Sequence, residues 1–160
     1  MRSDDLSTGP RIYASGSYAQ AFAGLGQYGL DIFVLEGPIG AASALKLAYA
    51  GLTKGFTALG AAMVGAAARH HLADALRSEL ARSQPDLLIR IERFLPAMLP
   101  KAYRWVAEME QIAEFAGDES TGASLYNGAA RLYQQITDEL EAEPSSEWLS
   151  ALTAFCKHQR

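Results

Sequence analysis

The residues best suited to catalysis or ligand binding lie where a glycine-rich turn leads into an apolar helix. This segment reads Gly37-Pro-Ile-Gly40-Ala-Ala-Ser43-Ala-Leu-Lys46-Leu-Ala-Tyr49. Lys46 falls on the second helical turn, among small apolar neighbours. One interpretation places it on the solvated side of an amphipathic helix. The other places it, partly desolvated, at a junction between domains, where loss of water favours the neutral amine and allows proton exchange near neutral pH.

Three neighbours of Lys46 are candidate substrate contacts. Tyr49 follows Lys46 by three residues and Lys54 follows it by eight, so both fall near the same helix face. Lys54 is interpreted either as a solvated lysine or as a contact for an anionic substrate or a cofactor phosphate. Ser43 lies outside any Gly-x-Ser-x-Gly motif, so we interpret it as a contact and not as a nucleophile.

Metal and thiol chemistry are not expected. His70 and His71 are adjacent and point to different sides of a helix, so they cannot bind one metal ion from one face. Cys156 is the single cysteine, which excludes an intramolecular disulfide and a cysteine-based zinc cluster. A lone cysteine fits a reducing compartment such as the cytoplasm, and we expect its thiol to be inert.

Before this segment, the sequence predicts a short β-α-β pattern over residues 1–36. Arg11–Ser15 and Asp31–Leu35 are rich in β-branched and aromatic residues, which is typical of strands. Ser17 can cap a helix that runs to about Tyr28, with Gly29 as its stop. Because two strands seldom form a stable sheet alone, we expect a further segment upstream.

After this segment, the sequence predicts a mainly α domain over residues 37–160. Residues 41–68 contain eleven alanines and four glycines, which predicts one long helix that other helices approach closely. Capping and helix-breaking residues predict further helices over about 72–82, 86–95, 101–116 and 122–142, and from Ser145 or Ser146 to Phe155. In this prediction Ser83 caps the helix at 86–95, and Pro96 and Pro100 interrupt the chain.

Two groups of residues on the helix at 101–116 have structural interpretations. Tyr103, Trp105 and Met109 are predicted to lie in the core and not in a binding site. Arg104 and Glu108 are four residues apart, which predicts an ordinary surface ion pair worth about 0.2–0.5 kcal/mol.

Three stretches carry a family resemblance. They are the Gly37–Tyr49 segment, Ala50-Gly-Leu-Thr-Lys-Gly55, and Met98-Leu-Pro-Lys-Ala-Tyr-Arg-Trp-Val106 with the Glu108–Phe115 stretch after it. They resemble the C-terminal helical domain of the β-hydroxyacid dehydrogenase superfamily, and more specifically a family of phosphogluconate dehydrogenase-like, NAD-binding C-terminal domains. The resemblance covers nearly the whole chain, and residues 10–36 resemble the final β-α-β unit of that family's Rossmann domain.

The resemblance implies a reaction and a role for Lys46. In these enzymes an NAD(P) cofactor exchanges hydride with a carbon that bears a hydroxyl, and a lysine removes or returns the hydroxyl proton. The family motif is Gly-x-Gly, three residues, the lysine, and an asparagine four positions later. Lys46 takes the lysine position, while Ala42 replaces the second glycine and Ala50 replaces the asparagine. Tyr49 is the candidate to supply a hydroxyl in place of the missing amide.

No residue of this chain is expected to hold the cofactor. Gly24-x-Gly26-x-x-Gly29 matches the dinucleotide-binding pattern, but it falls at the end of a helix and before a strand, the reverse of the order that holds a pyrophosphate. We therefore expect the chain alone neither to bind NAD(P) nor to turn over substrate. Its expected partners are a Rossmann domain, upstream or in trans, and a small hydroxyacid-like substrate.

Composition and charge indicate which other classes of partner are expected. The net charge of −4 over 160 residues argues against a nucleic-acid domain. No stretch reaches the roughly 20 apolar residues of a membrane span, so we expect a soluble, cytoplasmic protein. Small and apolar residues on several helix faces predict a homodimer through the long helix. The alternative to a dehydrogenase domain is an independent helical dimerisation or interaction module without catalytic activity.

Overall fold

The computed structural model describes residues 10–117, 120–142 and 146–157. The chain divides into two compact units, Met1–Tyr49 and Ala50–Arg160, which we call the first and second unit. Most described residues are helical, and the first unit contains a two-stranded parallel sheet, so the predicted mainly α fold with a short β-α-β segment is confirmed. The predicted domain boundary between residues 36 and 37 stays a prediction.

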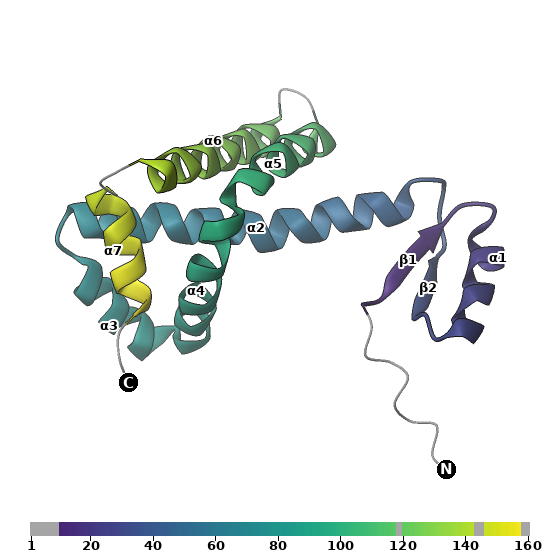
Figure 1. Ribbon diagram of the computed structural model, residues 1–160, viewed down its shortest axis with the longest axis horizontal. Helices are drawn as coiled ribbons and strands as arrows, with labels where there is room; N and C mark the ends of the chain where they lie inside the picture. The colour runs from purple at the N-terminus through teal and green to yellow at the C-terminus, as the bar shows by residue number, and fades with distance from the viewer. Residues whose placement is uncertain (1–9, 118–119, 143–145, 158–160) are drawn as a thin grey trace, which may run out of the picture. The chain divides into compact units, whose positions relative to one another are not determined.

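The first unit has the predicted β-α-β order. It comprises strand β1 (Ile12–Ser15), helix α1 (Ala19–Ala23), the 3-10 helix η1 (Gly24–Tyr28) and strand β2 (Ile32–Leu35). The strands pair in parallel with Ile12 opposite Ile32, and the helical segment connects them (Figure 1). Gly29 ends η1 with a φ of +87°, the conformation that a glycine stop supplies.

The predicted helix cap at Ser17 is wrong. Tyr18 occupies the N-cap position of α1, and no side chain bonds to the first turn. The Ala19 amide instead donates to the backbone carbonyl of Gly16, 3.0 Å away. A backbone turn therefore satisfies an amide for which the sequence suggested a serine hydroxyl.

Helix α2 (Ala41–Arg69) is the predicted long helix, continuous over 29 residues. Two of its glycines lie directly against large side chains in the second unit. A Cβ atom added at Gly51 would lie 2.9 Å from the hydroxyl of Tyr126, and one added at Gly65 would lie 1.9 Å from Nε1 of Trp148. Glycines of α2 therefore leave room for large side chains of α6 and α7 against its backbone.

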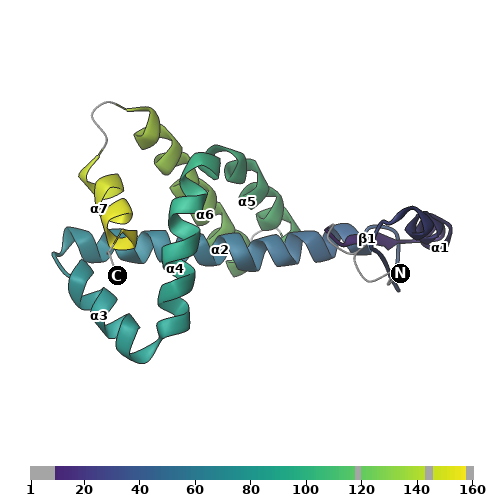
Figure 2. The same ribbon diagram turned by 60° about the horizontal axis from the view of Figure 1, so that its bottom comes forward.

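The other helices of the second unit pack around α2. They are α3 (Ala73–Ser83), α4 (Pro85–Met98), the 3-10 helix η2 (Leu99–Lys101), α5 (Ala102–Ala116), α6 (Thr121–Glu141) and α7 (Glu147–Cys156). Helices α5 and α6 lie side by side as a helical hairpin in both views (Figures 1 and 2). Ser146, one of the two serines predicted to start this helix, caps α7, because its hydroxyl accepts a hydrogen bond from the Leu149 amide (3.1 Å). The other, Ser145, lies outside the described residues.

Two predicted helix boundaries are wrong. Pro96 lies inside α4 and does not interrupt it. Its neighbours Leu95 and Met98 are buried, so packing of this face outweighs the hydrogen bond that proline cannot donate. Ser83 ends α3 and does not cap α4, where Gln84 takes the N-cap position.

The core of the second unit forms where these helices meet. Its largest fully buried side chains are Val64, Met98, Met109, Ile112, Tyr133, Ile136 and Leu152. Met109 is therefore a core residue, as predicted, and Trp105 is half-buried with its ring edge-on to Tyr133 at a centroid distance of 5.3 Å. Tyr103 is 63% exposed. Its predicted core position is wrong, because α5 buries one face and Tyr103 lies on another.

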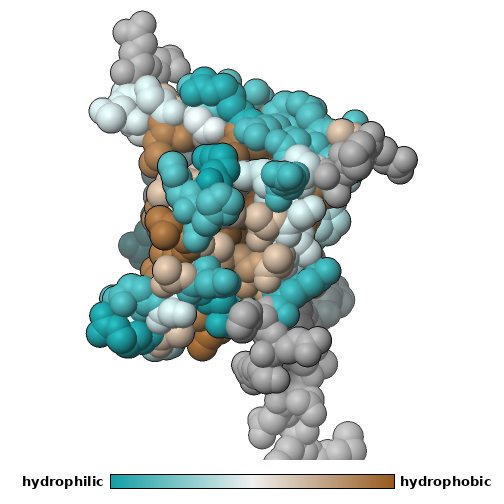
Figure 3. Space-filling model, turned by 90° about the vertical axis from the view of Figure 1, so that its left-hand side faces the viewer, coloured by the Kyte–Doolittle hydropathy of each residue, from teal (hydrophilic) through white to brown (hydrophobic). Residues whose placement is uncertain are grey.

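No helix in the described residues is long and apolar enough to cross a membrane. Apolar side chains nevertheless reach the surface, and Figure 3 shows hydrophobic residues in brown between hydrophilic residues in teal. In the second unit Leu52, Leu59, Met63 and Leu125 are each more than half exposed. Isolated exposed leucines are common, whereas neighbouring ones indicate a surface that another molecule can cover.

Candidate functional site

The candidate site is built on the turn that leads from β2 into α2. Gly40 in this turn has a φ of +96°, a conformation that glycine adopts without steric cost. The first turn of α2 is fixed to β1, because the Ala42 amide donates to the hydroxyl of Ser15 (3.0 Å). Ser15 thereby satisfies an amide that the helix itself leaves unpaired. The turn and this hydrogen bond together place the start of α2 beside β1.

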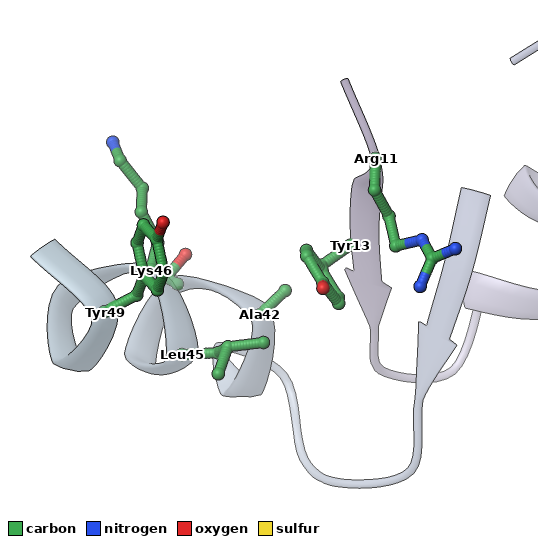
Figure 4. Close-up of a pocket in the computed structure, with 7 residues that line it drawn as sticks. Arg11, Tyr13, Ala42, Leu45, Lys46 and Tyr49 are labelled. Carbon is green, nitrogen blue, oxygen red and sulfur yellow. The ribbon is translucent and has the colours of Figure 1, made fainter. Parts of the chain in front are cut away.

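A cleft of about 600 Å³ lies within the first unit, between residues of β1 and the first turns of α2. Its lining residues are Arg11, Tyr13, Ala42, Ser43, Leu45, Lys46 and Tyr49 (Figure 4). Three of the four predicted site residues, Ser43, Lys46 and Tyr49, therefore line the same cleft.

Sequence reasoning missed two residues of the cleft, Arg11 and Tyr13. Tyr13 and Ser15 occupy alternate positions in β1, and Arg11, just before the strand, continues the alternation, so the three side chains emerge on one face of the sheet. Ser15 bonds to the first turn of α2, and Tyr13 points toward the same helix, whereas the Arg11 side chain extends across β2 toward Asp31 and Phe33 (Figure 4). The period of two in Arg11-Ile-Tyr13-Ala-Ser15 is the signal that could have identified them.

Among the residues that the structure describes, the lining of the cleft contains cations and hydroxyl groups and no carboxylate. Arg11 donates through Nε to the carboxylate of Asp31 (2.9 Å), which lies outside the lining, and its guanidinium lies 5.6 Å from the centroid of the Phe33 ring. The hydrogen bond and charge of Asp31 raise the pKa of Arg11, so this residue stays cationic. Such a cleft suits a ligand that carries a hydroxyl and a negative charge.

Lys46 is exposed at the cleft. Figure 4 shows its side chain extending beside the ring of Tyr49, with the ammonium group directed away from β1, while Ala42 and Leu45 point toward Tyr13. Tyr49 is 68% exposed. The polar groups of Lys46 and Tyr49 are thus accessible from outside the chain.

Lys54 does not line this cleft and has different surroundings in the second unit. Its ammonium group forms an ion pair with the carboxylate of Glu108 and lies 5.1 Å from the centroid of the Trp105 ring. Both charged side chains are only 22% exposed. Glu108 therefore pairs with Lys54 and not, as predicted, with Arg104. The predicted contact between Lys54 and substrate stays a prediction.

A second polar contact fixes the same part of α2. The hydroxyl of Tyr133 donates to the backbone carbonyl of Lys54 (2.5 Å). Burial raises the pKa of Tyr133 above its usual value, so the phenol keeps the proton that it donates. Lys54 is thus held through its side chain by α5 and through its backbone by α6.

The glycine pattern at residues 24–29 lies where the sequence predicted it. Gly24 and Gly26 belong to η1, and Gly29 ends it just before β2. A dinucleotide cradle requires the opposite order, with the glycines between a strand and the start of a helix. Across the described ranges, no group of three or more His, Cys, Asp and Glu side chains could hold a metal ion.

Cys156 is half-buried at the end of α7. Burial, assisted by the negative charge of Glu92 and opposed by Arg77, raises the pKa of its thiol to about 11. Since the thiolate is the nucleophilic form, a thiol with this pKa is unreactive near neutral pH. The prediction of an inert cysteine is consistent with this environment.

Comparisons with known proteins found one family model and similar solved structures. Residues 67–136 match the family model described as domain of unknown function DUF1932. The conserved protein MTH1747, of unknown function and reported to be structurally similar to 3-hydroxyacid dehydrogenases, is 28% identical with a TM-score of 0.68 over 80% of this chain and 50% of its own. A conserved hypothetical protein from Sinorhizobium meliloti 1021 is 19% identical with a TM-score of 0.75, over 91% of this chain and 52% of its own.

This chain thus spans about half the length of both similar structures. A search of curated proteins found no match. The likeness to MTH1747 extends beyond the family model to most of the chain, as the resemblance seen in the sequence implied. Over residues 67–136 this chain is therefore similar to the DUF1932 domain, and over most of its length its fold is similar to that of MTH1747.

Proposed function

We propose that this chain is the C-terminal, substrate-binding part of an NAD(P)-dependent oxidoreductase of the 3-hydroxyacid dehydrogenase type. The observation that supports this most is that Ser43, Lys46 and Tyr49 line one cleft at the start of α2. The fold in which they do so is similar to that of MTH1747, which is itself reported to be similar to 3-hydroxyacid dehydrogenases.

In this proposal Lys46 is the acid–base group. Its amine accepts the proton of the substrate hydroxyl as the carbonyl forms, and its ammonium returns that proton in the reverse direction. The hydroxyl groups of Ser43 and Tyr49 hold the substrate oxygen in place, since the asparagine of the family motif is replaced by Ala50. Arg11 supplies a permanent positive charge for the acid group of a small hydroxyacid.

The cofactor would be held elsewhere. Gly24–Tyr28 and Gly29 lie in the wrong order for a dinucleotide cradle, and the Ala42 amide at the start of α2 is already bonded to Ser15. The described residues therefore do not fit a dinucleotide. We propose that a Rossmann domain, upstream or in trans, binds NAD(P), and that the assembled enzyme works in the cytoplasm, where a single cysteine stays reduced.

Ligand binding to the cleft tests this proposal. We expect a panel of small 3-hydroxy acids to shift the backbone amide NMR signals of Ser43, Lys46 and Tyr49 in a saturable way. The variant Lys46→Gln removes the charge and should weaken this binding by about tenfold or more, the loss of one charge-assisted hydrogen bond.

Lys101→Gln is the matched control, because Lys101 is also an exposed lysine and does not line the cleft. It should bind the acids as the unaltered chain does. Equal binding by the two variants, or shifts confined to residues outside the cleft, would contradict the proposed function and favour a helical module without catalytic activity.

A further inference from the structure

We propose that the cleft between β1 and α2 binds a 3-hydroxy acid with one carboxylate and an apolar substituent of about the size of an aromatic ring. This inference rests on the proposed function and names the substrate class of the same site. The proposed chemistry uses the polar groups of the cleft. It leaves unused the apolar side chains of Tyr13, Ala42 and Leu45, which we call the apolar wall.

The apolar wall is formed by side chains that face one another. Ala42 and Leu45 of α2 point toward Tyr13 of β1 (Figure 4). Leu45 is 39% exposed and Tyr13 is 43% exposed, so both retain surface that a ligand can cover. The ring of Tyr13 lies edge-on to the ring of Phe33 on the paired strand, with 5.7 Å between the centroids. Because this contact favours one orientation of the ring, the wall is formed before a ligand arrives.

Two neighbouring stripes of α2 contribute to the cleft. Ser43 and Lys46, which the proposed chemistry uses, are three residues apart and form one stripe. Ala42 and Leu45 form the other, offset by one residue, which is a rotation of about 100° around the helix. In a 3-hydroxy acid, one carbon bears both the hydroxyl and the substituent. A hydroxyl held at Ser43 and Lys46 therefore directs that substituent toward the apolar wall.

The cleft has room for a ring-sized substituent. Its volume of about 600 Å³ lies within the range of about 300–1,000 Å³ that is usual for sites of drug-sized ligands. A methyl substituent would leave most of the apolar wall in contact with water, whereas a ring would cover it and release that water. The wall thus favours the larger substituent.

The charges at the cleft favour an acid with one carboxylate. Arg11 carries further N–H donors, but its Nε already donates to the carboxylate of Asp31 (2.9 Å), which offsets part of its charge. A phosphorylated acid would bring a second negative group for which Lys46 alone remains among the cations of the described lining. A polyhydroxylated acid would place hydroxyl groups against the apolar wall, where they would lose their hydrogen bonds to water.

Two acids that differ only in their substituent test the inference. 3-Hydroxy-3-phenylpropanoate and 3-hydroxybutanoate share the carboxylate and the hydroxyl, and they carry a phenyl and a methyl group. In an NMR titration of the full 160-residue chain, the phenyl acid should bind about 30-fold or more tightly, because its ring leaves water. It should also shift the amide signals of Ala42 and Leu45 in addition to those of Ser43 and Lys46.

Leu45→Gln is the variant that tests the wall, because it places an amide of similar size on it. This change should weaken binding of the phenyl acid by about tenfold and leave binding of the methyl acid within about twofold. Leu52→Gln is the matched control. It makes the same change on the same helix at a residue that is 73% exposed and does not line the cleft, so both acids should bind it as they bind the unaltered chain.

The outcomes separate this inference from the proposed function. Equal affinities of the unaltered chain for the two acids, with shifts at Ser43 and Lys46, would overturn the apolar substituent and leave the proposed function standing. Equal weakening of both acids by Leu45→Gln would do the same. Binding of neither acid would contradict the proposed function, and the inference with it. The comparison of the two acids on the unaltered chain does not depend on how any variant folds.

Discussion

Lys46 and Lys54 lie eight residues apart on α2 and have opposite environments. Lys46 is exposed at the cleft of the first unit, whereas Lys54 is largely buried against Glu108 and Trp105 in the second unit. An exposed amine can meet a ligand, while a buried ion pair with an aromatic neighbour mainly fixes the helices that carry it. At the residue scale, burial and partners thus separate two lysines that helical spacing alone makes equivalent.

A first prediction concerns the thiol of Cys156. Its pKa is raised from 9.0 to about 11, so at about pH 8 the folded chain contains roughly 100-fold less thiolate than an unperturbed cysteine would. Iodoacetamide should therefore alkylate the folded chain about 100-fold more slowly than the urea-unfolded chain, as followed by mass spectrometry. Equal rates in the two states would contradict the prediction.

The same shift has a consequence for stability. Because the folded-state pKa of Cys156 lies above the unfolded value, the folded chain keeps a proton that the unfolded chain loses between pH 9.0 and about 11. The contribution of this thiol to stability is therefore complete below about pH 9 and declines as the pH rises toward 11. As the pH rises from about 9 to 11, the free energy of unfolding of a Cys156→Ala variant should therefore fall less than that of the unaltered chain.

At the scale of elements, the glycines of α2 determine which helices can pack on it. Tyr126 of α6 lies over Gly51, and Trp148 of α7 lies over Gly65. Each glycine leaves room that any side chain would fill, and the gain in packing offsets the intrinsic helix cost of glycine, about 1 kcal/mol each.

A second prediction follows for Gly65. In Gly65→Ala the new Cβ would lie 1.9 Å from Nε1 of Trp148, so the indole or α7 must move, and we expect a loss of about 1–3 kcal/mol in the free energy of unfolding. Gly60→Ala is the control on the same helix, because its Cβ would meet Ile91 at an ordinary 3.6 Å.

This control should be neutral or more stable by up to about 1 kcal/mol, since alanine favours the helix. Urea unfolding followed by circular dichroism measures both variants. Similar losses for the two alanines would show that the contact with Trp148 is not the cause.

Much of the helical architecture could be predicted from the sequence, because its signals are local. Glycines and capping residues predicted the ends of α2, α5 and α7 to within a few residues. Pro96 shows the limit of such signals, since its neighbours Leu95 and Met98 are buried and keep the helix intact. The Lys54–Glu108 pair joins residues 54 positions apart, and no local spacing reveals a partner at that distance.

The candidate site could be predicted in part for the same reason. Ser43, Lys46 and Tyr49 share one helical segment, so sequence spacing grouped them. Arg11 and Tyr13 come from a strand some thirty residues earlier, and only the parallel pairing of β1 with β2 and the Ser15 hydrogen bond bring them to α2.

At the scale of the whole molecule, the first unit exposes more apolar surface than a finished sheet would. Tyr18, Tyr28 and Ile39 are 85%, 75% and 86% exposed, and within the described residues the sheet has two strands. Sheets of this size need further strands or packing partners for stability. This supports the proposed Rossmann domain, into which β1 and β2 would extend.

A third prediction concerns the cofactor. Titration of the isolated chain with NADPH, followed by nicotinamide fluorescence, should give no saturable response in the micromolar range. Gly24, Gly26 and Gly29 lie between a helix and a strand, and the Ala42 amide at the start of α2 is already bonded to Ser15. The chain joined to a Rossmann domain is the positive control and should bind. Saturable micromolar binding by the isolated chain would contradict the proposal that a separate Rossmann domain binds NAD(P).

The contact between Trp148 and Gly65 gives the protein an optical reporter. The chain has two tryptophans. The other one, Trp105 of α5, contacts α2 at Lys54, away from Gly65. Replacing Trp105 with phenylalanine would leave one indole, whose emission shifts to longer wavelength when α7 departs and water reaches the ring. Fluorescence can then distinguish release of the last helix from opening of the α5–α6 hairpin, two events that a helicity signal merges.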